Sequence, residues 1–424
     1  MSRRWIALIS VCWLLASMAV AAGVEPFVQA ITQALAHNPE IKAAEANWLA
    51  AQERLPQSRA ALLPNLALNV TPNQNHSRWR GGSSTESSLA TGVTLTQMVY
   101  NRSALIAFDQ TAPFIGAYGD ELESAVQGVF LKVAKAVVGL LQAREIAQLA
   151  GNNLQVMQRH LTATQSRHRV GEITRTDVSQ AEARLASAQA DKSRAENNVA
   201  VARAQFFEVV GISAAETLAL PPFRQAIGDK PLESWLSQLE QRADMRAASK
   251  RLVLAESAIA QERAGHWPTV ALTSSVNHTW QRGDVEELEQ FKVGMKMELP
   301  IFSGGMTQSK TAEAQAKRDG QLAQLDRLRR QAYREIEQAF LELKSSQALT
   351  SSFESTVAAS RMARDGVARE YQVGQRTSLD LLDAEHELFS NQTELAKNRY
   401  GLVLAQFQML WSVGRLTLEE LVIQ

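Results

Sequence analysis

Two aspartates near the C-terminal end of the chain are placed to act together on ions. Asp380 and Asp383 are three residues apart in a segment with a helical pattern, so both carboxylates fall on one helix face. Crowded like charges raise each other's pKa and attract cations. The simpler alternative is a pair of solvated surface acids. The choice between the two depends on what other elements bring to this face.

Residue types that support catalysis are scattered. His160 and His168 fall on one expected helix, but no carboxylate accompanies them at ligand spacing, and the sequence has no Gly-rich phosphate loop or nucleophile elbow. We therefore expect no enzyme activity, no catalytic residue, no cofactor and no metal site. The chain has 44 basic and 44 acidic residues, so it lacks the excess of positive charge that is typical of proteins that bind nucleic acid.

The N-terminal residues have the features of a secretory signal peptide. Arg3 and Arg4 precede the apolar run 5–15, and the small residues 19–22 supply a cleavage pattern, so we expect residues 1–22 to be removed. A retained anchor is the alternative, but the run is shorter than the ~20 residues that a spanning helix needs. We expect no later segment to qualify. The single cysteine, Cys12, lies inside this run, which is unlike a lipid-modified mature N-terminus.

The same landmarks occur twice in the same order. Only 6% of the residues are aromatic, while Ala, Gln, Glu, Leu and Arg dominate long tracts, a composition typical of extended helices that pack through small side chains. The repeated landmarks are 38–43 and 242–247, 59–64 and 263–268, Val99-Tyr100 and Ile301-Phe302, Val170-Gly171 and Val373-Gly374, and Gly211 and Gly414. We interpret them as a tandem duplication, with a first repeat at 23–217 and a second at 218–424.

Each repeat is expected to contain two strands after its opening helix. Phe291, Val293, Met295, Met297 and Leu299 alternate with polar residues or glycine, which predicts a strand with one apolar face. Weaker alternation predicts three more strands, around 66–70, 93–99 and 270–276. Residues 72–88 and 281–290 are polar or glycine-containing and are expected to be loops.

Four aromatic residues stand at the ends of these expected strands. They are Tyr100, Trp267, Trp280 and Phe302. Such positions fit either an aromatic girdle at a membrane interface or ordinary hairpin packing in a soluble domain, and the sequence does not decide between them.

The rest of each repeat is helical over unusual lengths. Residues 120–168 and 307–370 contain no proline and little glycine, and as helices they would reach about 70 and 95 Å. A second helix follows each one, at 176–209 and 377–411, so each repeat should contain an antiparallel helical hairpin. Pro113 and Gly116 predict a kink or a fresh helix start before the first long helix.

The four strands imply an oligomer. An exported chain with ten-residue strands that carry one apolar face suggests a membrane β-barrel, but four strands cannot close one. Open edges in lipid leave backbone groups unpaired at several kcal/mol each, so other copies must complete the sheet. Two copies would give a filled lumen, and three would give twelve strands and a pore. The alternative is a soluble four-stranded sheet packed on a helix.

These residues and their order resemble the TolC family of outer-membrane efflux and secretion channels. The resemblance covers essentially the whole mature chain. It rests on Asn38-Pro39, the two strand-entry prolines Pro64 and Pro268, and the segments 170–177, 299–305 and 371–384. Each motif is weak alone, and their duplicated order is specific.

The resemblance implies a mainly α fold with a small β part. Tandem-duplicated long-helix hairpins would form an α-barrel across the periplasm, and four strands per protomer would contribute to a twelve-stranded trimeric β-barrel in the outer membrane. It also implies a homotrimer in outer-membrane lipid that works with a periplasmic adaptor (a membrane fusion protein) and an inner-membrane ABC or proton-driven transporter. The exported material would be proteins, by type I secretion, or small toxic compounds. The unmodified N-terminus favours the secretion branch.

The resemblance also assigns roles to single residues. Asp380 and Asp383 would ring the periplasmic constriction. Tyr371 would bond Asp177, and Arg376 would bond the backbone or hydroxyl around Thr176, together forming a gate latch. The hairpin tips, Val170-Gly171 and Val373-Gly374, would meet the adaptor. The competing class of function is a non-channel periplasmic coiled-coil tether or scaffold, against which the alternating strands argue.

Overall fold

The computed structural model describes residues 25–220, 230–282 and 287–417. The expected signal peptide, residues 1–22, lies outside the described residues. The order of elements occurs twice along the chain: helices, two strands, a long helix and a returning helix. The chain is therefore mainly helical with one four-stranded antiparallel sheet, as expected.

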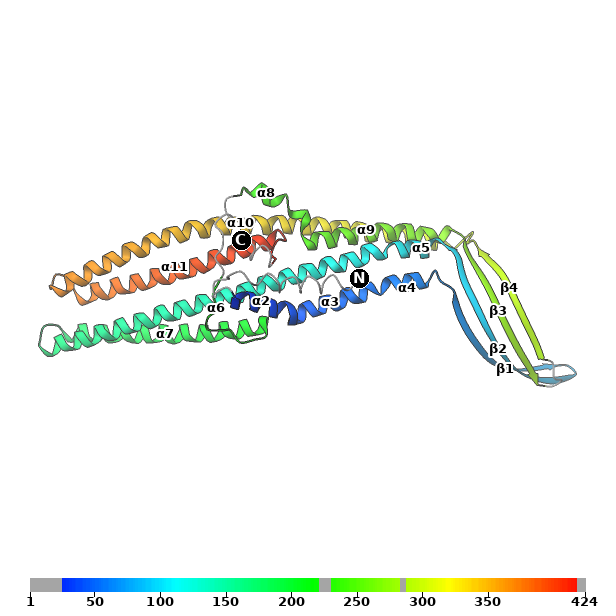
Figure 1. The fold of residues 1–424 in the computed structure, drawn as a ribbon, viewed down its shortest axis with the longest axis horizontal. Coiled ribbons are helices and arrows are strands. Elements are labelled where there is room, and N and C mark those ends of the chain that lie inside the picture. The colour runs from blue at the N-terminus through cyan, green and yellow to red at the C-terminus, as the bar shows by residue number, and fades with distance from the viewer. Residues whose placement is uncertain (1–24, 221–229, 283–286, 418–424) are drawn as a thin grey trace. The chain divides into compact units, whose positions relative to one another are not determined.

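The two helical hairpins contain the longest elements. The first pairs α6 (Thr111–Arg169) with α7 (Arg175–Val210), and the second pairs α10 (Met306–Gln372) with α11 (Ser378–Ser412) (Figure 1). The long helices and their returning partners are confirmed. The fresh start is also confirmed, since α5 (Arg102–Asp109) ends before α6 begins, and Pro113 stands in the first turn of α6, where its missing N–H removes no hydrogen bond.

Small side chains let the returning helix pack closely. Buried alanines occur on α7 at every seventh residue: Ala181, Ala188, Ala195 and Ala202. This spacing keeps one narrow seam facing a partner helix, as in coiled coils. The helix ends at Gly211, whose φ of 81° is a left-handed conformation that larger residues resist.

The chain divides into two compact units, each built from segments of both halves. The first holds residues up to 43 together with 123–242 and 330–424, and includes α2 (Glu25–His37) and α8 (Leu232–Leu236). In its core Phe27 and Phe407 are fully buried, with ring centroids 6.0 Å apart. The buried Arg242 guanidinium donates to the Ser412 carbonyl oxygen at 2.8 Å and pairs with Glu335 at 2.9 Å, so this charge is satisfied inside the unit.

The second unit holds residues 44–122 and 243–329, and it contains the sheet. Its helical part includes α4 (Arg54–Ala60), α5, α9 (Ala243–Arg263) and most of α3 (Pro39–Gln52). Asp120 is one-tenth exposed and accepts from Lys250 at 2.5 Å and Arg246 at 3.2 Å, so these two cations tie α9 to the start of α6. The 3-10 turn η3 (Ala264–His266) follows α9, while η2 (Leu239–Gln241), which precedes α9 in the sequence, belongs to the first unit.

The sheet has the order β1-β2-β3-β4, with antiparallel pairs throughout. Its strands are β1 (Asn65–Trp79), β2 (Gly82–Asn101), β3 (Thr269–Arg282) and β4 (Glu287–Glu298). At one end the strands join helices, and at the other end β1 and β2 join each other in a hairpin (Figure 1). β1 and β4 each keep one free edge within the described chain. Pro72, which cannot donate a backbone hydrogen bond, lies on the edge strand β1, where this is tolerated.

The expected loop at 72–88 is wrong. The ladder continues through these residues to the pair Trp79–Gly82, which leaves only residues 80 and 81 for the turn. Ser, Thr and Asn fit a solvated two-stranded ribbon because cross-strand pairing satisfies their backbone groups without an apolar face. Of the expected loop at 281–290, both ends belong to strands, since β3 reaches Arg282 and β4 begins at Glu287, and residues 283–286 lie outside the described residues.

One helical stretch is long and apolar enough to cross a membrane by length and composition. It lies within Arg102–Arg169, and half of its apolar window is buried. The expectation that no later segment would qualify is therefore wrong. The buried helix of a protein core meets the same test, and Val129, Phe130 and Val133, which are at most 1% exposed, show that this part of α6 is such a helix.

Candidate functional site

The tips of the two hairpins have the same local structure. Gly171 and Gly374 have φ values of 80° and 78°, conformations open to glycine at little cost. At the first tip the Gly171 N–H donates to the His168 carbonyl oxygen and the Glu172 N–H donates to that of Arg167, both at 3.0 Å. This pattern closes a helix C-terminus, and the second tip repeats it.

Each tip exposes an apolar side chain. Val170 is 72% exposed and Val373 is 71% exposed, and each stands directly before the turn glycine. An exposed valine at a defined turn gives no stability to the single chain. The two tips are thus alike in their turn and in their exposed valine.

A capping box starts the returning helix after each tip. The Thr174 side chain accepts from the Asp177 N–H, and the Asp177 carboxylate accepts from the Thr174 N–H at 2.9 Å. Thr377 and Asp380 form the same box at the start of α11. The spacing of these residues, Thr-x-x-Asp, is a signal from which both helix starts can be predicted.

The two candidate ring acids have different partners. Hydrogen bonds from the Thr377 backbone and hydroxyl lower the pKa of the Asp380 carboxyl below its ordinary value, with Arg376 adding to this. Asp383 pairs with Arg184 of α7 at 2.6 Å. Within one chain the Asp380 carboxylate is thus stabilised by Thr377 and Arg376, and the pKa increase expected of a ring of acids requires further copies. The acidic ring remains a prediction.

The candidate latch residues lie at or near the two hairpin tips, and Asp177, Arg376 and Tyr371 each make a contact other than the expected one. Asp177 bonds Thr174, and Arg376 pairs with Glu370 at 2.9 Å. Tyr371 lies at the end of α10 with the Arg167 guanidinium 4.7 Å from its ring centroid. The links from Tyr371 to Asp177 and from Arg376 to Thr176 therefore remain predictions about a state or an assembly that this chain alone does not form.

Other contacts, missed from the sequence, join the two hairpins. Besides the Arg184–Asp383 pair, His160 of α6 lies 3.1 Å from the Ser378 hydroxyl and 6.0 Å, ring centroid to centroid, from Tyr371. Burial lowers the pKa of His160 below 6.5, and the positive charge of Arg167 lowers it further. From the sequence alone, His160 stood out only as a possible metal ligand, and its contact with the second hairpin could not be seen.

Leu382, which lies between the two candidate ring acids in the sequence, packs α11 against the first hairpin. Leu382 is 1% exposed and packs against Leu154 and Met157 of α6 and Ala188 of α7. Because Leu382 is buried, the turn of α11 that carries Asp380 and Asp383 is held against the first hairpin.

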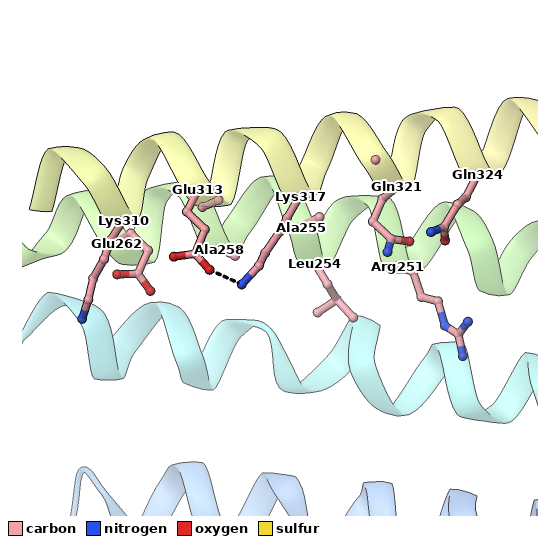
Figure 2. Close-up of a pocket in the computed structure, with 12 residues that line it drawn as sticks. Arg251, Leu254, Ala255, Ala258, Glu262, Lys310, Glu313, Lys317, Gln321 and Gln324 are labelled. Carbon is pink, nitrogen blue, oxygen red and sulfur yellow. Dashed lines mark ion pairs between the residues drawn. The ribbon is translucent and has the colours of Figure 1, made fainter. Parts of the chain in front are cut away.

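A separate groove lies between α9 and α10 in the second unit. It has a volume of about 640 Å³ and is lined by Arg251, Leu254, Ala255, Ala258, Glu262, Lys310, Glu313, Ala314, Lys317, Gly320, Gln321 and Gln324. Figure 2 shows the labelled side chains on α9 and α10, with Glu313 and Lys317 of α10 paired at 2.6 Å. The groove mixes opposite charges and is lined by no Ser, Thr, Cys or His. No group of three metal-ligating side chains occurs in the described part of the chain.

Comparison with known proteins decides the family. The family model described as "Outer membrane efflux protein" matches residues 30–211 and 236–415. The chain belongs to the outer membrane efflux protein family. Its two matched segments correspond to the two halves that show the same order of elements.

Individual members of the outer membrane efflux protein family match over nearly the whole chain. Outer membrane efflux protein BepC of Brucella suis is 27% identical over 406 residues, which is 94% of this chain and 88% of BepC. Outer membrane protein TolC of Escherichia coli is 27% identical over 413 residues, 94% of this chain and 84% of TolC. The outer-membrane channel OprN has the same fold, with a TM-score of 0.83, 21% identity and coverage of 92% of this chain and 90% of OprN.

Membership of this family fixes the general function. The chain is an outer-membrane channel of an efflux or secretion system, with a long helical extension into the periplasm. It is a transport protein and not an enzyme. The non-channel tether is thereby set aside.

Proposed function

We propose that three copies of the chain form one continuous conduit whose outer-membrane part is a twelve-stranded β-barrel. The observation that carries this proposal is the sheet. It has two free edges, at β1 and β4, and one apolar face that nothing in the described chain covers. In lipid each unpaired backbone group costs several kcal/mol, so β1 of one copy pairs with β4 of the next.

The alternation of the faces supports a lipid-facing exterior. Leu68, Val93, Val276 and Phe291 form one apolar row across all four strands. Leu68 and Phe291 are both 71% exposed in the single chain. Tyr100, Trp267 and Phe302 stand at the helix end of the sheet, and Trp280 stands near the hairpin end. These positions fit two interfacial girdles.

The repeats at 23–217 and 218–424 supply equivalent hairpins to the periplasmic part. In the proposed assembly Val170, Gly171, Val373 and Gly374 contact a periplasmic adaptor, which links the channel to an inner-membrane ABC or proton-driven transporter. The exposed valines and the matching turns support this role. The exported material is protein, by type I secretion, or small toxic compounds.

The same tips carry the proposed gate. Asp380 and Asp383 of three copies line the constriction, and Tyr371 with Asp177 and Arg376 with Thr176 latch it. Because all these residues lie within a few turns of the tips, an adaptor bound there can release them. It needs only to bind the open state more tightly.

Two measurements on the detergent-extracted protein test the assembly. Native mass spectrometry should show a trimer, and the trimer should conduct ions when added to a planar lipid bilayer. A folded monomer, or a trimer that never conducts, would contradict the proposal.

A further inference from the structure

The face of the sheet opposite the apolar rows is polar, and most of its side chains are small. The row next to Leu68 contains Ala67, Thr94, Ser275 and Lys292. The Asn277 amide donates to the Ser275 hydroxyl at 3.3 Å and lies over Gly92, where an added Cβ would come within 2.0 Å of the Asn277 oxygen. Small hydroxyl and amide side chains therefore form most of this face.

The charges on this face are few and uneven. Over the paired residues 65–73, 88–98, 269–280 and 288–298, the charged side chains on the polar face are Lys292, Lys296 and Glu298. Lys296 pairs with Glu298 at 2.9 Å, so these two charges compensate each other. Lys292 lies opposite Ser275, and Glu298 is about 20 Å farther along the strand, so the Lys292 charge is left over.

The position of Lys292 in the proposed barrel extends the distance over which its ammonium charge acts. When the apolar face meets lipid, the polar face lines the water-filled lumen. A charge at a lumen wall surrounded by a low-dielectric membrane acts over a larger distance than one on an open surface, because the walls focus its field.

We propose that Lys292 forms a ring of three ammonium groups inside the membrane barrel and that this ring binds multivalent anions on their way through. The inference rests on the proposed trimer. The ring attracts carboxylate and phosphate groups, so passengers with clustered anionic groups are held at the barrel. Its sign is opposite to that of the acids at the hairpin tips.

Block of the reconstituted channel by inorganic triphosphate tests the ring. Triphosphate is added to the side of the strand hairpins while the current through the wild-type trimer is recorded. Half-block should require at least about tenfold more triphosphate in Lys292→Gln than in the wild type, because the three ammonium charges act on the same anion. Lys292→Arg should keep the block, since it keeps the charge.

A double variant provides the matched control. Lys296→Gln with Glu298→Gln removes two charges from the same face and leaves the net charge unchanged, so its half-block concentration should stay within about twofold of the wild type. Absence of block in the wild type, equal block in Lys292→Gln, or an equal loss in the double variant would each overturn the ring. A protein that fails to conduct at all would instead contradict the trimeric channel.

Discussion

A charge placed on the apolar face of the sheet should prevent membrane assembly, whereas the same charge one residue later should not. Leu68 and Asn69 are neighbours on β1 and point to opposite faces, in the rows of Val93 and Gly92 respectively. Leu68→Arg puts a guanidinium where the proposal places lipid. Asn69→Arg puts it where the proposal places water.

The size of the effect follows from the position of the row. An arginine on the lipid face of a membrane barrel costs roughly 2–4 kcal/mol near the bilayer midplane. Three copies per channel lose roughly 6–12 kcal/mol in total, which is comparable with the whole stability of an ordinary domain. Asn69→Arg adds a solvated charge to the lumen and should change the free energy of assembly by less than about 1 kcal/mol.

Refolding into phospholipid vesicles followed by urea titration measures this difference. The fraction of trimer is read from gel mobility, and helical content is read by circular dichroism. The helical signal should persist in Leu68→Arg because β1 belongs to a different unit from most of the long helices. Equal loss of trimer in both variants, or no loss in Leu68→Arg, would refute the assignment of the faces.

Three further predictions concern the hairpin tips. Changing Asp380 and Asp383 together to Ala should abolish block by multivalent cations added from the periplasmic side, and unchanged block would remove the acidic ring. Leu382→Ala should lower the free energy of unfolding by about 2–5 kcal/mol, as measured by urea titration, whereas Leu379→Ala, at a site 41% exposed, should have little effect; equal effects would contradict the packing. Because the folded pKa of His160 is below 6.5, its contribution to stability is complete above that pH and is lost as the pH falls through the folded value. The fall in unfolding free energy from about pH 7.5 to about pH 5.5 should therefore be smaller in His160→Gln, and an identical fall would exclude His160 as its cause.

Most of the fold could be predicted because the spacing of apolar residues and the positions of turn residues are local signals. Alternation at Phe291 to Met297 predicted β4, and the turn glycines Gly171 and Gly374 marked both hairpin tips. The extended β1–β2 ribbon was missed because its Ser, Thr and Asn residues are also typical of loops. Only the cross-strand partner, which is a tertiary feature, separates the two structures.

The contacts of the candidate site could not be predicted for a related reason. Arg184 and Asp383 meet because α7 and α11 are each turned about their own axis, and aligned along their length, in one particular way. No local sequence pattern fixes this rotation or this alignment. The alanines at every seventh residue of α7 predict a narrow packing surface, but this pattern does not show which helix packs against it. Resemblance named the latch residues without giving the contacts that each makes within its own chain.

The contacts between the hairpins bear on how such a channel could open. The Arg184–Asp383 pair is half-exposed and contributes about 0–1 kcal/mol, whereas burial of Leu382 contributes about 2–5 kcal/mol. Separating the two hairpins of one chain therefore costs mainly the burial of Leu382 and little for the exposed ion pair. We expect opening to keep Leu382 buried, so that both hairpins of each copy move together. An adaptor then needs a differential affinity of only a few kcal/mol to shift the population of the open state.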